Sequence, residues 1–83
     1  MVERPYVVRA TWDDEAKLWV AVSDDVPGLV AEAAEIETLI KKLQVLVPEL
    51  LEANGIIPKQ DHRTVDIPFK LFAAYQGQIR APA

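Results

Sequence analysis

The hydrophobic pattern of the chain changes its period after residue 33, and this change limits the folds that the chain can form. Before that point, apolar side chains occur in short β-branched and aromatic runs, which are typical of strands. From residue 36 to residue 51 they recur every three or four residues, as on one side of a helix. These helical positions are Ile36, Leu39, Ile40, Leu43, Leu46, Val47, Leu50 and Leu51. Strands followed by one amphipathic helix predict an α+β fold.

Three strands are predicted before the helix. Residues 6–12 and 17–23 are separated by an acidic turn, and together they predict a β-hairpin. Pro27 and Gly28 suit the central positions of a type II turn, because Pro restricts φ and Gly accepts a positive φ. Residues 29–33 can then form a short third strand.

The register of the hairpin decides which side chains face the core. We predict a turn with one extra residue, because that register places apolar side chains of both strands on a single face. The predicted pairs are Trp12 with Leu18, Ala10 with Val20 and Val8 with Val22.

The opposite face of the hairpin is predicted to stay open and to form an interface. It would carry Val7, Arg9, Thr11, Trp19 and Ala21, with Ser23 at its end. A large aromatic side chain such as Trp19 on an open face indicates a binding or oligomer surface. If the register is reversed, Trp19 belongs to the core instead, and the sequence leaves both alternatives open.

The helix is predicted to end at Asn54-Gly55, where Gly can adopt a left-handed cap. Pro48 lies inside the helical pattern, where proline removes one hydrogen bond and clashes with the preceding turn. We therefore expect a kink at Pro48 or a break into two shorter helices. At the start, Ala34-Glu35 lacks a strong capping side chain, which weakens the helix by about 1 kcal/mol.

A last strand is predicted over residues 64–74, with alternating apolar side chains on one face. These are Val65, Ile67, Phe69 and Leu71. Pro68 has no backbone donor, so this strand should lie at an edge of the sheet or be interrupted. Residues 75–83 show no periodicity and are expected to form a tail, disordered in part.

The order of these elements is β-β-β-α-β, within a single domain over residues 1–74. A right-handed crossover through the helix would place the last strand parallel to the first. We therefore predict a two-layer sandwich, in which one helix covers a four-stranded mixed sheet of strand order 3-2-1-4.

No catalytic, cofactor or metal site is predicted, and we do not expect an enzyme. The clustered carboxylates, Asp13-Asp14 and Asp24-Asp25, fall near opposite ends of the second strand, where they suit solvated turns. The single histidine, His62, lies in a polar loop without an evident nucleophile. There is no cysteine and no phosphate-binding glycine loop.

Net charge restricts the expected partners. Nine basic and thirteen acidic residues leave a formal charge of −4, which repels nucleic acid and attracts a basic protein. Charged residues interrupt every long apolar stretch, so no membrane span is expected. The chain has no cysteine and no visible secretory signal, and we expect a cytoplasmic location.

The ordered set of motifs over about residues 6–55 resembles the HicB-like antitoxin-type domains. The set includes a strand, an acidic turn, the Trp19-Val20-Ala21 strand, the D-x-P-G-L loop at residues 25–29 and the helix ending L-L-E-A-N-G. It is most similar to a stand-alone, uncharacterised bacterial branch of that group. The resemblance implies a sheet like that of a truncated ribonuclease H, without the carboxylate site of that enzyme.

HicB-type antitoxins neutralise a small basic toxin that cleaves messenger RNA, so the resemblance implies a protein-binding module. Many of them also carry a C-terminal DNA-binding segment, but nothing after Gly55 matches one. We therefore expect a homodimer, through the open face or an edge strand, that binds a basic protein partner. The alternative is a small-molecule-binding accessory protein or enzyme that uses the open face in an oligomer.

Overall fold

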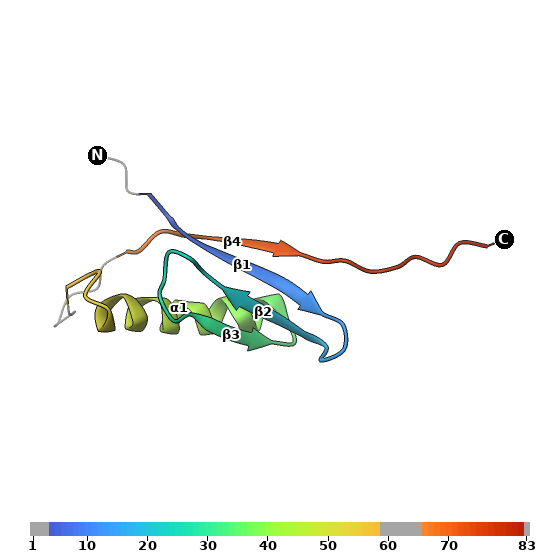
Figure 1. Cartoon of the computed structure of the whole chain (residues 1–83), viewed down its shortest axis with the longest axis horizontal. Coiled ribbons are helices and arrows are strands. Elements are labelled where there is room, and N and C mark those ends of the chain that lie inside the picture. The colour runs from blue at the N-terminus through green and yellow to red at the C-terminus, as the bar shows by residue number, and fades with distance from the viewer. Residues whose placement is uncertain (1–3, 59–65, 83) are drawn as a thin grey trace.

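The computed structural model describes residues 4–58 and 66–82, and within them one helix covers one face of a four-stranded sheet (Figure 1). The elements are β1 (Tyr6–Asp13), β2 (Leu18–Val22), β3 (Val30–Ala33), α1 (Ile36–Ala53) and β4 (Phe69–Ala74). The strand order is β3-β2-β1-β4. The first three strands are antiparallel neighbours, and β4 runs parallel to β1. The predicted α+β class, element order and strand order are confirmed.

The hairpin register differs by one residue from the predicted one. The structure pairs Trp12 with Trp19, Thr11 with Val20 and Ala10 with Ala21. The prediction was wrong because the turn closed by Asp13 and Leu18 contains one residue more than the predicted register allows.

The local chemistry of the turn explains this register. Asp13 Oδ1 accepts hydrogen bonds from the backbone N–H groups of Glu15 at 3.1 Å and Ala16 at 3.2 Å. Lys17 completes the turn in the left-handed region, with φ 57°. An Asp carboxylate that accepts hydrogen bonds from backbone N–H groups two and three residues further along the chain stabilises a tight turn.

This register moves Trp19 and Ala21 to the face that α1 covers, so their predicted place on the open face is wrong. Ala21 is fully buried, and Trp19 packs against the core. A slip of one residue exchanges the two faces of a strand, and β2 is apolar on both. Arg9 and Thr11 are exposed on the open face and Val7 is half-buried there, as predicted.

The core lies between α1 and the sheet. The helix contributes large side chains from one stripe, and the sheet contributes mostly small ones. The buried helical residues are Leu39, Leu43, Val47 and Leu51, and the buried alanines are Ala10, Ala21, Ala31 and Ala33. Small side chains on the sheet allow the helix to approach closely, so the leucines fill the space between the two layers.

The turn before β3 and the end of the helix were both predicted correctly from the sequence. Leu29 N–H donates to the carbonyl oxygen of Val26 at 3.2 Å, and Gly28 has φ 81°, which confirms the type II turn. At the end of α1, Gly55 has φ 70° and Ile56 N–H donates to the carbonyl oxygen of Leu51 at 2.9 Å, so the helix stops where predicted.

The helix itself is continuous through Pro48, so the predicted alternative of a break is excluded. Glu35 occupies the N-cap position and its side chain makes no capping hydrogen bond, in line with the weak start expected from the sequence. The helix therefore depends on its buried stripe rather than on its ends.

The last strand begins at Phe69, directly after Pro68, and lies at the edge of the sheet as predicted. The carbonyl oxygen of Pro68 accepts a hydrogen bond from Tyr6 N–H at 3.0 Å, which starts the pairing with β1. The predicted residues Thr64 and Val65, and His62, lie outside the described residues. Ile67, Phe69 and Leu71 pack against the core, as the alternation indicated.

Beyond β4, the chain continues as an extended segment that leaves the body of the molecule (Figure 1). The molecule measures 60 × 27 × 19 Å along its principal axes. Across the described parts of the chain, no helix combines the length and apolar character that crossing a membrane requires.

Candidate functional site

The open face of the sheet carries an apolar row that crosses all four strands. Phe72 lies beside Arg9, Arg9 beside Val22, and Val22 beside Val30. The three apolar side chains of this row are 57%, 50% and 63% exposed for Phe72, Val22 and Val30. Single exposed apolar residues are common on protein surfaces, but here Val22 and Val30 are direct neighbours and Phe72 follows across Arg9, a grouping that indicates a contact surface.

A second row follows beside the first. It runs from Ala74 through Thr11 and Val20 to Glu32. On the other side of the apolar row, Val7 lies beside Lys70. The open face therefore has an apolar centre, basic side chains on β1 and β4, and an acidic side chain on β3. We call these residues the open-face site: Val7, Arg9, Val20, Val22, Val30, Glu32, Lys70 and Phe72.

Arg9 lies in the middle of the open-face site and contacts only one carboxylate among the described residues. Its Nη1 atom is 3.9 Å from Oδ2 of Asp24, and both side chains are largely exposed. An exposed ion pair of this length contributes little to stability. The guanidinium can therefore exchange Asp24 for a group on a binding partner at little cost.

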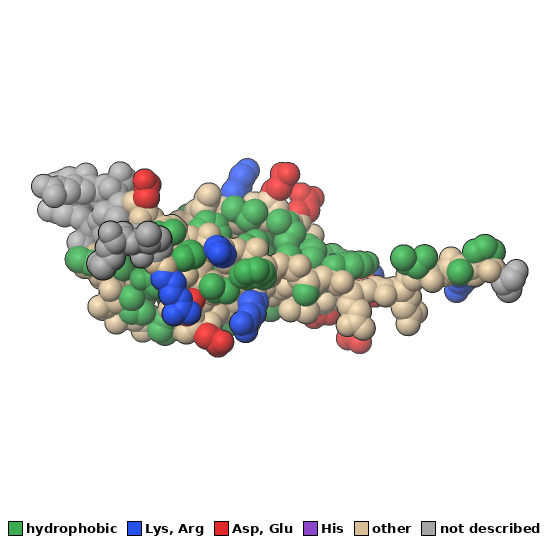
Figure 2. Space-filling model, turned by 90° about the horizontal axis from the view of Figure 1, so that it is seen from above, with side chains coloured by type: hydrophobic (Ala, Val, Ile, Leu, Met, Phe, Trp, Pro, Cys, Tyr) green, Lys and Arg blue, Asp and Glu red, His purple; other side chains and the backbone are tan. Residues whose placement is uncertain are grey.

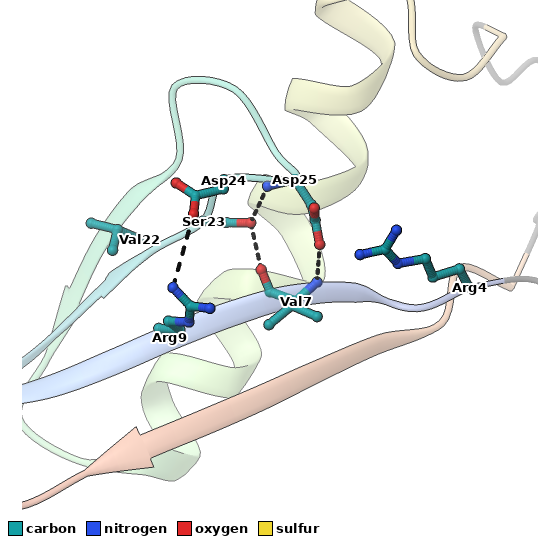
Figure 3. A pocket seen from close by; sticks show the side chains of 7 residues that line it. All are labelled: Arg4, Val7, Arg9, Val22, Ser23, Asp24 and Asp25. Atoms are coloured by element: carbon teal, nitrogen blue, oxygen red, sulfur yellow. Dashed lines mark hydrogen bonds and ion pairs between the residues drawn. The ribbon is translucent and has the colours of Figure 1, made fainter.

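A shallow hollow adjoins the open-face site where β2 enters the loop to β3 (Figure 3). It is lined by Arg4, Val7, Arg9, Val22, Ser23, Asp24 and Asp25. Asp25 Oδ2 accepts a hydrogen bond from Val7 N–H at 2.8 Å, and Ser23 Oγ donates to the carbonyl oxygen of Val7 at 2.6 Å (Figure 3). Ser23 Oγ also accepts from the N–H groups of Asp25 at 3.1 Å and Val26 at 3.2 Å. These groups attach the loop to β1, which assigns them a structural role.

Three aromatic rings gather at the opposite end of the sheet, next to the hairpin turn. The ring centroids of Trp12 and Trp19 are 5.4 Å apart with an interplanar angle of 62°, an edge-to-face contact. Tyr75, just beyond β4, lies 6.1 Å from Trp12 and 6.4 Å from Trp19. This cluster fixes the point at which the chain leaves the sheet.

Beside these rings, Asp14 and Lys17 form the shortest ion pair among the described residues, with Nζ 2.9 Å from Oδ1. Trp12 Nε1 also donates to Asp14 Oδ1 at 3.3 Å. The hydrogen bond from Lys17 and the one from Trp12 lower the pKa of Asp14. The same carboxylate raises the pKa of Lys17. Both groups are fully exposed, so they suit a turn better than a reaction centre.

The carboxylates singled out in the sequence do not converge. Asp13 ends β1 and Asp14 follows it in the hairpin turn, whereas Asp24 and Asp25 lie beyond the other end of β2. Within residues 4–58 and 66–82, no group of three His, Cys, Asp or Glu side chains is placed to hold a metal ion.

The structure brings together some predicted interface residues and adds others. Val7, Arg9 and Thr11 share the open face, and their contact with a partner stays a prediction. The residues of the open-face site that sequence reasoning missed are Val20, Val22, Val30, Glu32, Lys70 and Phe72. The signal for the β2 members was their alternation with Trp19 and Ala21, which a correct register would have assigned to the open side.

Comparison with known proteins gives one family match and one similar solved structure. Residues 5–81 match the family described as a domain of unknown function, DUF1902. The crystal structure of the hypothetical protein TTHA1013, from the extremely thermophilic bacterium Thermus thermophilus, superposes with a TM-score of 0.66 at 45% sequence identity. The match covers 94% of this chain and 100% of that one. No curated protein matches the sequence.

Proposed function

The chain belongs to the family described as a domain of unknown function (DUF1902), and for this chain we propose a role as a protein-binding module whose open-face site receives a protein partner. The observation that carries the proposal is the apolar row from Phe72 to Val30, of which half or more of each large apolar side chain is exposed. No described segment of the chain covers this row.

The composition of the open-face site suits a protein contact. Burial of Phe72, Val22 and Val30 against another chain would supply the apolar centre that interfaces require. Arg9 lies in that row, and arginine and aromatic side chains dominate binding energy in many interfaces. Glu32 and Lys70 lie at opposite sides of the row and would set the orientation of a partner.

The net charge and the resemblance together support a basic partner. A formal charge of −4 attracts a basic protein over a distance and speeds its association. The likeness of the sequence to HicB-like domains supports a particular class, a small basic toxin that cleaves RNA. We place this interaction in the cytoplasm, in line with a chain that contains no cysteine.

Two substitutions that change the charge equally, on different surfaces, test the site. Val30 on the open face and Val45 on α1 are 63% and 59% exposed, so Val30→Lys and Val45→Lys are closely matched. The wild-type chain is first used to capture its partner from the native host, and the partner is then purified. We expect Val30→Lys to weaken its binding about tenfold or more in calorimetry, and Val45→Lys to change it by about twofold or less.

The captured protein decides the toxin class, and the two variants decide the face. A basic protein whose RNA cleavage stops on addition of the wild-type chain, but continues with Val30→Lys, supports both parts of the proposal. If both variants weaken binding equally, long-range charge explains the effect and the open-face site is rejected. Capture of an acidic partner, or of a basic one without RNA cleavage, rejects the toxin class.

A further inference from the structure

The extended segment after β4 projects away from the sheet and the helix of its own chain (Figure 1). We call residues 75–82 the C-terminal arm. The radius of gyration of the chain is 15.6 Å, whereas a compact domain of this length has about 12 Å. Figure 2 shows the arm projecting beyond the body with hydrophobic side chains along it. Ile79 in the arm is 96% exposed, the highest value among the large apolar side chains of the described residues.

The first residues of the arm are held in a defined direction. Tyr75 packs on Trp12 and Trp19, on the side of the sheet that α1 occupies. Gly77 follows so closely that a Cβ atom at that position would lie 2.9 Å from the Tyr75 ring. The arm therefore continues the line of β4, and alternation along an extended chain places Ile79 on the same side as Tyr75.

The outer edge of β4 offers a place for another strand. Among the described strands, β4 pairs only with β1, so one side of its backbone faces outward. Its sequence, FKLFAA, contains a single charge, Lys70. Natural proteins protect such edges with charges, bulges or covering segments, because an unprotected edge pairs with other chains. Figure 2, seen from the β4 side, shows hydrophobic side chains along this part of the body.

An apolar hollow lies on the α1 side of this same edge. Leu43, Val47 and Pro48 of α1 line it on one side, and Ile67 and Phe69 line it on the other. Its rim carries Gln44 and Asp66. A single aliphatic side chain that arrives along the edge of β4 would enter it beside Phe69.

We propose that a second copy of this chain docks antiparallel on the edge of β4, and that the two copies exchange their C-terminal arms. A two-fold axis perpendicular to the sheet at Ala74 joins the two sheets into one and keeps both helices on the same side. Ala74 then lies opposite its equivalent, and residues 75–79 of each copy lie along residues 73–69 of the other. The arm therefore covers β4 as far as its first residue, Phe69.

Side-chain chemistry selects this register. With the axis at Ala74, Ile79 lies opposite Phe69 of the second copy and fills the hollow, and Gln78 lies opposite Lys70. A shift of the axis to Tyr75 keeps the faces matched but places Arg80 opposite Lys70, so two like charges would meet. The dimer forms through the edge of β4 and leaves the open face uncovered, so this inference does not depend on the proposed function. The two open-face sites lie on the same side of the joined sheet and would be presented together to a partner.

Sedimentation of the full chain over a range of concentrations tests the arm. We expect a dimer for the wild type, and an increase of about tenfold or more in the dissociation constant for Ile79→Asp. Ile79 is almost fully exposed in one copy, so this substitution leaves the fold of a single copy unchanged. Val45→Asp, with the same change of charge on the exposed side of α1, is the control and should leave the dissociation constant within about twofold.

A cross-link tests the register. The chain contains no cysteine, so Ala74→Cys introduces a single thiol at the proposed axis, directly opposite its equivalent. We expect rapid disulfide formation between two copies, and none above background for Ala16→Cys in the exposed hairpin turn.

Three results would overturn the proposal. A monomer at every concentration excludes the dimer, and equal dissociation constants for Ile79→Asp and Val45→Asp exclude the arm. A dimer that Val30→Lys disrupts and Ile79→Asp does not would show that the copies meet through the open-face site instead.

Discussion

The two faces of the sheet differ in the polarity and in the exposure of their side chains. The face that α1 covers carries buried alanines together with larger apolar side chains, including Val8, Trp19 and Phe69. The open face combines Val20, Val22, Val30 and Phe72 with the charged side chains of Arg9, Glu32 and Lys70. The covered face needs small side chains because the leucines of α1 supply the volume of the core. The open face has no such partner within the described chain, so its apolar side chains Val22, Val30 and Phe72 stay exposed. Among the described residues no polar side chain is buried under α1, whereas charged side chains lie among the exposed apolar ones on the open face, so polarity and exposure distinguish the two faces.

Truncation of one large side chain on each side tests this contrast with the largest expected effect. Leu43 is 1% exposed, and Leu43→Ala should lower the free energy of unfolding by about 2–5 kcal/mol, because it leaves a cavity. Val30→Ala on the open face should change it by less than about 0.5 kcal/mol. Urea denaturation of both variants provides the comparison, and similar losses would mean that the open face is a second core.

Enlargement of one side chain on each face is the opposite test, and we expect it to have an intermediate effect on the free energy of unfolding. Ala21 is fully buried below α1, so Ala21→Leu should cost about 1–3 kcal/mol as the helix is forced outward. Val22 is the next residue and faces the other way, and Val22→Leu should be neutral within about 0.5 kcal/mol. The same denaturation assay applies. If Val22→Leu were the more harmful of the two, the hairpin register described above would be incorrect.

The exposed charges at the end of the hairpin contribute least. The pKa of Asp14 is lowered, mainly by the hydrogen bond from Lys17, so its ionised form stabilises the fold above about pH 3.9. That contribution is lost as the pH falls through the lowered pKa. The pKa of Lys17 is raised by Asp14, so its contribution is present below its ordinary pKa and disappears at higher pH.

Substitution of Asp14 by Asn isolates this pair. The difference in unfolding free energy between the wild type and Asp14→Asn should be small at neutral pH. It should vanish well below the lowered pKa, where Asp14 is protonated in both the folded and unfolded states. Every other carboxylate is common to both proteins and cancels from the difference. A difference that persists unchanged at low pH would assign the effect to the shape of the turn rather than to the charge.

The open-face site could be predicted only in part. Arg9 in the site, and Thr11 beside it on the same face, were placed correctly because β1 alternates between apolar and polar side chains from Val8 to Asp13. In β2, the sequence Leu18–Val22 is apolar at every position, so its pattern is compatible with either face. The predicted strand order already placed the last strand beside the first, but the register that brings Lys70 beside Val7 and Phe72 beside Arg9 has no local signal in the sequence.

The sequence by itself determined the types and the order of the elements. The helical stripe from Ile36 to Leu51, the Pro27-Gly28 turn and the Gly55 stop act within a few residues, and local chemistry is sufficient to specify them. Only the tertiary structure decided the hairpin register, the place of Trp19 and the pairing register between β4 and β1. These depend on a one-residue choice in the turn and on contacts between segments distant in sequence, which alternation alone leaves undetermined.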